Sequence, residues 1–105
     1  HYQVARASWI GDYADPQTFM DVFSDPANDA QYHNDQYNAL MDEVHNTVDV
    51  GKRMQLLHEA EQMLFDQSLL IPIYYTTTPY VANDKIAGYN WSILGTVDFK
   101  NAYRK

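Results

Sequence analysis

The 105-residue sequence has no cysteine, and this absence removes several kinds of chemistry at once. Disulfide bridges, thiolate nucleophiles and cysteine-ligated zinc or iron–sulfur centres are all excluded. Glycine is scarce as well, and the four glycines, at positions 11, 51, 88 and 95, stand apart from one another. The sequence therefore lacks the usual glycine-rich loop that binds phosphate, and its serines lie in no G-x-S-x-G motif of hydrolases.

Basic residues are half as frequent as acidic ones, since 7 Lys and Arg face 14 Asp and Glu, for a formal net charge of −7. Such a charge repels the phosphates of nucleic acids and of anionic lipid surfaces, so no nucleic-acid partner is expected. Long apolar runs are also missing. The longest, LLIPIYY at 69–75, is far shorter than the ~18 residues that a membrane-spanning helix needs.

What the sequence does contain is the composition of an ordinary globular chain, with 46% hydrophobic and 20% charged residues. Its length suits one domain with a single core. The first residues, HYQV, include neither an initiator methionine nor the regions of a signal peptide. We therefore expect a segment of a longer protein.

The first third of the sequence predicts a strand, a short helix and a loop. Residues 2–10 carry β-prone residues at both ends and predict a strand. Asp15 followed by Pro16 is typical of an N-cap and a first helical residue, and predicts a helix over 16–23. Residues 24–34 are rich in Ser, Asp, Asn and Pro and predict a loop.

The middle of the sequence predicts a helical hairpin. After a cap at Asn34, apolar residues recur every three or four positions as far as Val48, and Asp49 can cap a further helix over 50–66. The last helix has an inward stripe (Met54, Leu57, Ala60 and Leu64) and a mainly solvent-facing set (Lys52, Arg53, Glu59, Glu61 and Gln62).

Strand patterns return after the hairpin. The run LLIPIYYTTT at 69–78, with an extension over 80–82, predicts a buried strand, and 96–99 predicts a short final one. The fold class is thus mixed α/β, with the first strand and the strand after the hairpin able to pair in one small sheet.

Candidate catalytic and metal sites fail on inspection. The segment HEAEQ at 58–62 begins like a zinc-protease motif but has Gln62 in place of the second histidine. The acidic loop with Asp21, Asp25, Asn28 and Asp29 lacks the glycine and terminal glutamate of a calcium-binding EF-hand. No metal, cofactor or catalytic residue is expected. A small hydrolase using the carboxylates of Asp12 and Asp15 remains the alternative, although Asp15 already has a role as a helix cap.

Several motifs, in order, resemble one protein family. These are R-A-S-W-x-x-D-Y-x-x-P at 6–16, Y-x-x-L-M-x-E at 37–43, R-x-x-L-x-x-x-A-E-x-x-L at 53–64, I-P-I-Y-Y at 71–75, Gly88-Tyr89 and the final aromatic Tyr103. They resemble the C-terminal lobe of family 5 solute-binding proteins, which deliver oligopeptides or dipeptides to ABC transporters. The resemblance implies that residues 1–105 are one segment of that lobe, within a type II periplasmic-binding-protein fold, and that the chain is not an enzyme.

The resemblance also implies ligand contacts. Asp12 matches the aspartate that pairs with the α-ammonium group of a bound peptide, Trp9 matches a tryptophan of a side-chain pocket, and Arg6 matches an arginine near the peptide carboxylate. Backbone groups around Ser8, Ile10 and Gly11 are expected to pair with the extended ligand. Thr76 stands where better-known relatives carry a third tyrosine, which implies a roomier or more polar pocket.

Plainer roles stay open for the same residues. Trp9 could be a core residue, Asp12 a second cap or an Asx turn, and Arg6 a partner in a structural ion pair. Tyr74 and Tyr75 suit sheet packing at least as well as ligand contact.

The family further implies a membrane permease as a partner through the full-length protein, and a location in the periplasm or on the cell surface as a lipoprotein. Some of its members bind nickel complexes, haem or oligosaccharides instead of peptides. Because the cleft of this family needs a second lobe, the isolated chain is expected to bind peptides feebly. Its exposed lobe surface is expected to favour self-association.

Overall fold

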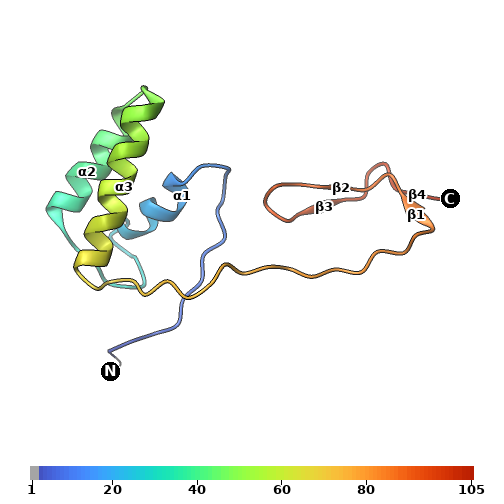
Figure 1. Cartoon of the computed structure of the whole chain (residues 1–105), viewed down its shortest axis with the longest axis horizontal. Coiled ribbons are helices and arrows are strands. Elements are labelled where there is room, and N and C mark those ends of the chain that lie inside the picture. The colour runs from blue at the N-terminus through green and yellow to red at the C-terminus, as the bar shows by residue number, and fades with distance from the viewer. Residues whose placement is uncertain (1–2) are drawn as a thin grey trace. The chain divides into compact units, whose positions relative to one another are not determined.

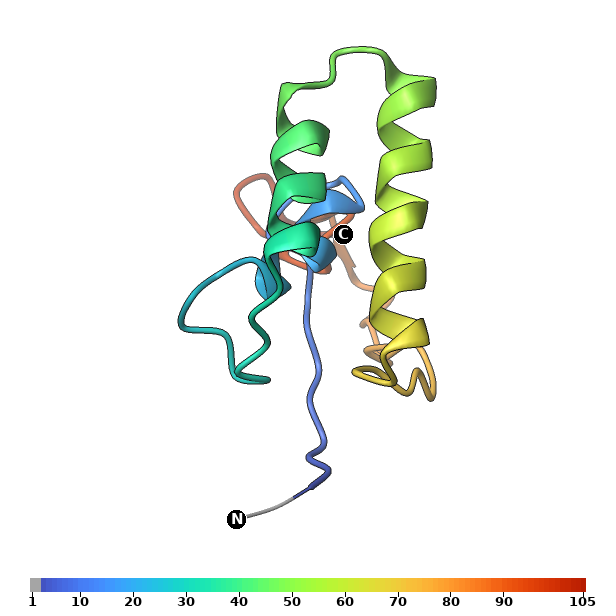
Figure 2. The same cartoon turned by 90° about the vertical axis from the view of Figure 1, so that its left-hand side faces the viewer.

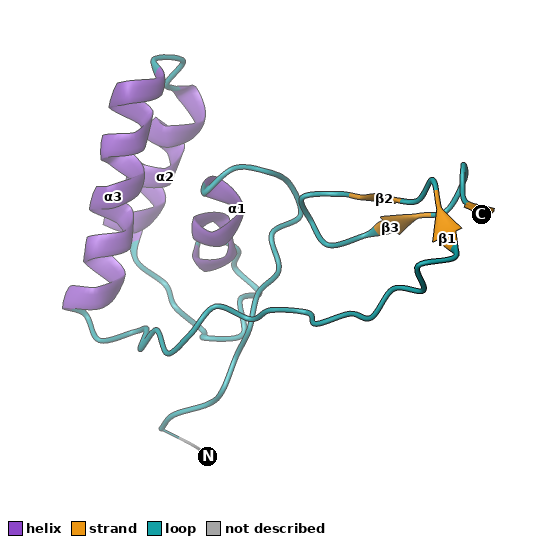
Figure 3. Cartoon of the chain, turned by 45° about the vertical axis from the view of Figure 1, so that its right-hand side comes forward, coloured by secondary structure: helices purple, strands orange, loops and turns teal. Residues whose placement is uncertain are grey.

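A computed structural model describes residues 3–105, and the chain divides into two compact units. The first unit ends at Pro72, and the second comprises Ile73–Lys105. Helices belong to the first unit and strands to the second (Figures 1 and 3). The predicted mixed α/β class is confirmed. Among the described helices, none has both the length and the apolar composition that crossing a bilayer requires.

The predicted helical hairpin is confirmed in the first unit. Helix α2 spans Asp35–Asn46 and helix α3 spans Val50–Asp66, and they lie side by side, joined by a short turn (Figures 1 and 2). Both predicted caps are present. The Asn34 side chain accepts hydrogen bonds from the N–H groups of Gln36 and Tyr37, at 2.9 and 3.1 Å, and the Asp49 side chain accepts one from Lys52 N–H at 2.7 Å.

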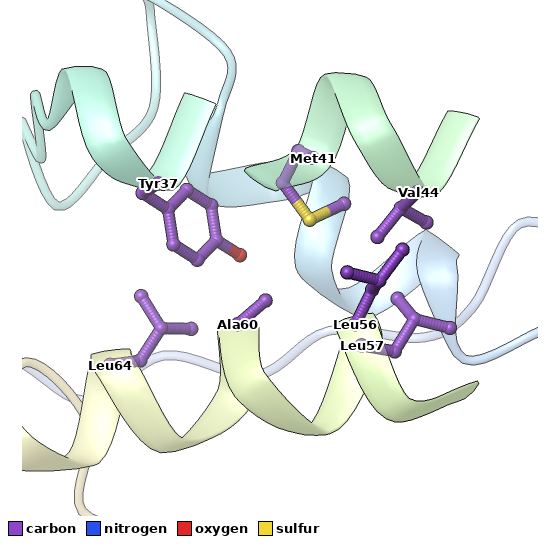
Figure 4. Close-up of a cluster of buried hydrophobic side chains, with 7 residues drawn as sticks. All are labelled: Tyr37, Met41, Val44, Leu56, Leu57, Ala60 and Leu64. Atoms are coloured by element: carbon purple, nitrogen blue, oxygen red, sulfur yellow. The ribbon is translucent and has the colours of Figure 1, made fainter. Parts of the chain in front are cut away.

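The core lies between these two helices (Figure 4). Its buried side chains are Tyr37, Met41 and Val44 from α2 and Leu56, Leu57, Ala60 and Leu64 from α3. Each of the larger ones contributes roughly 1.5–3 kcal/mol through apolar burial. The expectation for Val48 was wrong, because α2 ends at Asn46 and leaves that side chain exposed.

A short helical segment packs against the hairpin. Helix α1 spans Gln17–Met20 and continues as the 3-10 helix η1, Asp21–Phe23, which agrees with the predicted helix over 16–23. The buried Tyr37 hydroxyl of α2 donates a hydrogen bond of 2.9 Å to the Met20 carbonyl oxygen. This bond ties the end of α1 to the core.

The strands expected over residues 2–10 and 69–82 are not formed. Within 3–10 and 69–82 the chain is irregular and its side chains are largely exposed, with Tyr75 at 97% of its full exposure; Tyr2 lies outside the described residues. A strand is stable only when its backbone groups pair with a neighbour. Neither segment has such a partner among residues 3–105, so their β-prone side chains alone do not produce a sheet.

The second unit contains two small antiparallel sheets instead of the single sheet expected. Strand β1 (Ile86–Ala87) pairs with β4 (Tyr103–Arg104), and β2 (Asn90–Trp91) pairs with β3 (Val97–Asp98). Strand β3 confirms the short strand predicted over 96–99, but it is not the final strand, because β4 follows it. The turn between β2 and β3 contains Gly95 with φ of +79°, a conformation that glycine adopts without steric cost.

Candidate functional site

Residues 11–16 form a corner that leads into α1, and Asp15 stabilises this corner. One carboxylate oxygen, Oδ1, accepts a hydrogen bond of 2.9 Å from Gln17 N–H, and the Asp15 carbonyl accepts one of 3.3 Å from Thr18 N–H. Both bonds satisfy amides at the start of a helix that have no partner within it. The Asp15 side chain thus bonds the first amide of α1, as a capping residue would, but α1 begins at Gln17, so Pro16 takes the N-cap position that was predicted for Asp15.

Arg53 of α3 forms a bidentate ion pair with the same carboxylate. Its Nη1 lies 2.9 Å from Asp15 Oδ2 and its Nη2 lies 2.6 Å from Asp15 Oδ1, while Nη2 also donates to Gln17 Oε1 at 2.6 Å. Hydrogen bonds from Arg53, then from the Gln17 amide, hold the pKa of Asp15 below its ordinary value. The ion pair locks the corner onto the helical hairpin.

The expectation that Arg53 faces solvent was wrong, although the sequence carries a signal for its true place. Arg53 precedes Leu57, Ala60 and Leu64 at intervals of four, three and four, which puts it on the inward stripe of α3. An arginine at the end of such a stripe can bury its stem and still reach a carboxylate.

Asp21 is a second point where polar side chains gather. Its Oδ2 accepts hydrogen bonds from the Tyr13 hydroxyl at 3.0 Å and from Gln17 Nε2 at 3.1 Å, and its Oδ1 lies 2.8 Å from His45 Nε2 of α2. Desolvation, followed by the hydrogen bond to Asp21, raises the pKa of Tyr13. Asp21 thus joins the corner, η1 and α2.

Asp12 stands at the tip of this corner with its carboxylate exposed. Its backbone N–H donates a hydrogen bond of 3.0 Å to Thr18 Oγ1. Within residues 3–105 no group donates a hydrogen bond to the Asp12 side chain. The alternative in which that side chain caps a helix or closes an Asx turn is therefore not observed.

A cavity of about 440 Å³ opens beside the corner. Its lining residues come from the stretch before the corner (Trp9), the corner (Asp12 and Tyr13), α1 (Thr18), η1 (Asp21 and Val22) and the following loop (Asp25, Ala27, Asn28 and Asp29). Trp9 retains 51% of its full exposure, so it is not the core residue that one alternative proposed. An apolar indole and an unpaired carboxylate therefore face one concave, acidic site.

The other predicted contact residues do not line this cavity. Arg6, Ser8 and Ile10 lie on the exposed stretch before the corner, and Gly11 is half-buried at its start. Arg6 forms no ion pair with any residue in 3–105, so its alternative role as a structural partner is not observed. Thr76 is exposed and belongs to the second unit.

The loop over 24–34 uses its polar groups to hold its own shape. The buried Asn28 donates through Nδ2 to the carbonyl oxygens of Asp25 and Tyr32, at 2.7 and 2.9 Å, and accepts from Tyr32 N–H at 2.8 Å. Asp25 Oδ1 accepts from Ala27 N–H at 2.8 Å. In the part of the chain that the structure describes, no group of three or more His, Asp or Glu residues is arranged to hold a metal ion.

The geometry also weakens the hydrolase alternative. A general acid needs a raised pKa and a free oxygen, whereas Asp15 has a lowered pKa and both oxygens on Arg53. Asp15, the partner that this alternative gives to Asp12, is therefore not available as a general acid.

Comparison with known proteins gives consistent relatives. The oligopeptide-binding protein OppA of Bacillus subtilis is 34% identical over 107 residues, which cover 99% of this chain and 20% of the relative. The dipeptide-binding protein DppE of the same organism is 29% identical over 94% of this chain and 19% of its own length. The periplasmic oligopeptide-binding protein OppA of Salmonella typhimurium is 30% identical over 97% of this chain and 19% of its own length. The chain spans about one fifth of the length of these relatives, and no family model matches it.

Proposed function

Because this chain belongs to the family of oligopeptide- and dipeptide-binding proteins, as a segment of about one fifth of their length, we propose that it helps to capture peptides for an ABC transporter. We use the term parent protein for the longer binding protein that contains this segment. Residues 1–105 form one segment of the C-terminal lobe in this proposal, and they contribute binding contacts but no catalytic group.

The observation that carries the proposal is the joint position of Asp12 and Trp9 on one cavity of about 440 Å³. A peptide ammonium group that leaves water needs a charged hydrogen-bond partner, and the exposed carboxylate of Asp12 is free to be that partner. The Trp9 indole supplies a broad apolar surface to a neighbouring side chain. In this assignment, Asp12 binds the α-ammonium group and Trp9 contacts a side chain of the ligand.

A further set of contacts in the proposal comes from the exposed stretch before the corner. Among the described residues, no strand pairs with the backbone groups of Ser8, Ile10 and Gly11. An extended peptide can therefore form hydrogen bonds with them, as a strand added to a sheet does. Arg6 carries a guanidinium group suited to a ligand carboxylate. Thr76 is assigned to a side-chain pocket.

Partners and location follow from the same proposal. The parent protein acts outside the cytoplasm and delivers its ligand to a membrane permease, in keeping with the periplasmic relatives. The isolated chain exposes large apolar side chains, among them Ile71, Ile73, Tyr75 and Val81. These favour self-association of the fragment through a surface that the parent protein would cover.

Mass spectrometry of the small molecules that co-purify with the parent protein tests this function. Peptides are the expected result, whereas a nickel complex, haem or an oligosaccharide would replace the peptide class. Asp12→Asn should reduce peptide retention on the order of 30-fold or more, since truncating a desolvated charge pair costs about 2–5 kcal/mol. Asp42→Asn is the matched control, because Asp42 is an exposed carboxylate of α2 away from the cavity. Equal retention by both variants would remove Asp12 from the site.

A further inference from the structure

We propose that Thr18 is a positioning residue that holds Asp12 in its ligand-binding orientation; this inference rests on the proposed function. Thr18 is 2% exposed and lies in α1, six residues beyond Asp12 in sequence. Nothing in the sequence pattern singles it out. Its part emerges only when α1 folds back beneath the corner.

The hydroxyl of Thr18 acts on the backbone of Asp12. Thr18 Oγ1 accepts the hydrogen bond from Asp12 N–H at 3.0 Å. This bond restrains the peptide group between Gly11 and Asp12, and the direction of the Asp12 side chain depends on that peptide group. A carboxylate at the tip of a corner would otherwise sample many directions, and ordering it on binding would reduce affinity.

The methyl group of Thr18 acts on Gly11. A β-carbon placed on Gly11 would lie 2.9 Å from Thr18 Cγ2 and 3.3 Å from Phe19 Cζ, closer than side chains normally approach. Glycine is therefore required here by the close packing of α1 under the corner. Thr18 holds the corner at two adjacent residues, through its methyl group at Gly11 and its hydroxyl at Asp12.

The position of Thr18 is itself anchored to the hairpin. Its own N–H donates to the Asp15 carbonyl, Asp15 is gripped by Arg53 of α3, and the Met20 carbonyl two residues later accepts from the buried Tyr37 hydroxyl of α2. Asp12 is therefore connected to the core by a series of hydrogen bonds that passes through α1. Accurate binding requires such support from rigid elements.

Two substitutions separate the hydroxyl from the methyl group. Thr18→Val keeps the shape and removes the acceptor for Asp12 N–H, whereas Thr18→Ser keeps the hydroxyl and removes the methyl group. The parent protein carrying each substitution is titrated by calorimetry with one tripeptide in two forms, with a free and with an acetylated amino terminus. The acetylated form has no ammonium group for Asp12. Its affinity therefore reports every part of the site except the interaction under test.

Thr18→Val should weaken binding of the free-amine peptide about 3- to 10-fold, the range expected for the loss of one net hydrogen bond. Its binding of the acetylated peptide should stay within about twofold of the unsubstituted protein, and Thr18→Ser should retain the preference for the free amine. A general loss of structure would lower the binding-competent fraction, seen in the stoichiometry, without changing the ratio of the two affinities. Thr18→Ala repeats the removal of the hydroxyl should the valine variant not fold.

The inference is overturned if the hydroxyl-free variants bind both peptides like the unsubstituted protein, or lose affinity for both equally, while Asp12→Asn abolishes the preference for the free amine. If Asp12→Asn also leaves that preference unchanged, the proposed role of Asp12 itself is wrong. The two failures are therefore distinguishable in one set of titrations.

Discussion

The bidentate ion pair between Arg53 of α3 and Asp15 at the start of α1 should contribute measurably to the stability of the first unit. The relevant perturbations are Arg53→Met, Asp15→Asn and the double substitution. Their free energies of unfolding give the coupling between the two side chains without the separate costs of each change. Methionine keeps much of the apolar stem of Arg53, so the cycle isolates the charged group.

The expected coupling follows from the burial of the pair. Exposed ion pairs contribute about 0.2–1 kcal/mol, and hydrogen bonds to charged groups that are shielded from water contribute about 1.5–3 kcal/mol. The Arg53 and Asp15 side chains retain 19% and 31% of their exposure, which places them between these classes. We expect a coupling of about 1–2 kcal/mol at pH 7.

The sign of the pH dependence is set by the lowered pKa of Asp15. A carboxyl group with a depressed pKa in the folded state stabilises that state fully above its unfolded pKa, and this stabilisation is lost as pH falls through the folded pKa. The coupling should therefore be complete above the ordinary value of 3.8 and decline progressively at lower pH.

Urea unfolding of the 105-residue chain, followed by circular dichroism at 222 nm, where helices give a strong negative signal, measures the four free energies. The Lys52–Glu43 pair, at 2.7 Å but with side chains 57% and 50% exposed, is a matched control that should show a smaller coupling. An Arg53–Asp15 coupling below about 0.3 kcal/mol at pH 7, or no larger than that of the control, would contradict the reasoning.

Three further predictions concern the hairpin. Leu64→Ala should destabilise the chain by about 2–5 kcal/mol, because Leu64 is fully buried in the core; a loss below about 1 kcal/mol in urea unfolding would mean that the core closes around the gap. Asn34→Ala should cost about 1 kcal/mol through loss of the α2 cap, while Asn38→Ala, at an exposed interior position of the same helix, should not destabilise it. Burial raises the pKa of Tyr37, so in an ultraviolet titration of the folded chain Tyr37 should stay protonated after the exposed tyrosines ionise near pH ~10. Tyr37→Phe should remove that late component, whereas the contribution of Tyr13, whose pKa is also raised, should remain.

Local patterns were sufficient for the helices. Asn34 and Asp49 precede apolar residues at intervals of three and four, and both the capping bonds and the hairpin follow from interactions within a few residues. The same holds for Asp15 and Pro16 at the start of α1. Such features are short-range, so the sequence carries all the information they need.

Local patterns were not sufficient for the strands. The run at 69–78 has the β-branched and aromatic residues of a strand, but pairing depends on a partner that can come from anywhere in a fold. Among the described residues the partner is absent, and the chain there remains irregular. In the second unit, β2 pairs with β3 across the short turn at 92–96, whereas β1 pairs with β4 across residues 88–102, which contain that hairpin.

For the candidate site, the sequence by itself determined the chemistry that is available: an acidic chain without cysteine, an aspartate and a tryptophan three residues apart, and the family motifs around them. Only the tertiary structure decided which groups are free to act. It pairs Asp15 with Arg53 and places the Thr18 hydroxyl against the Asp12 backbone. It leaves the Asp12 carboxylate exposed, on the same cavity as Trp9. The physical reason is that residue types and spacings record local preferences, whereas the partner of a charged side chain depends on which distant elements pack together.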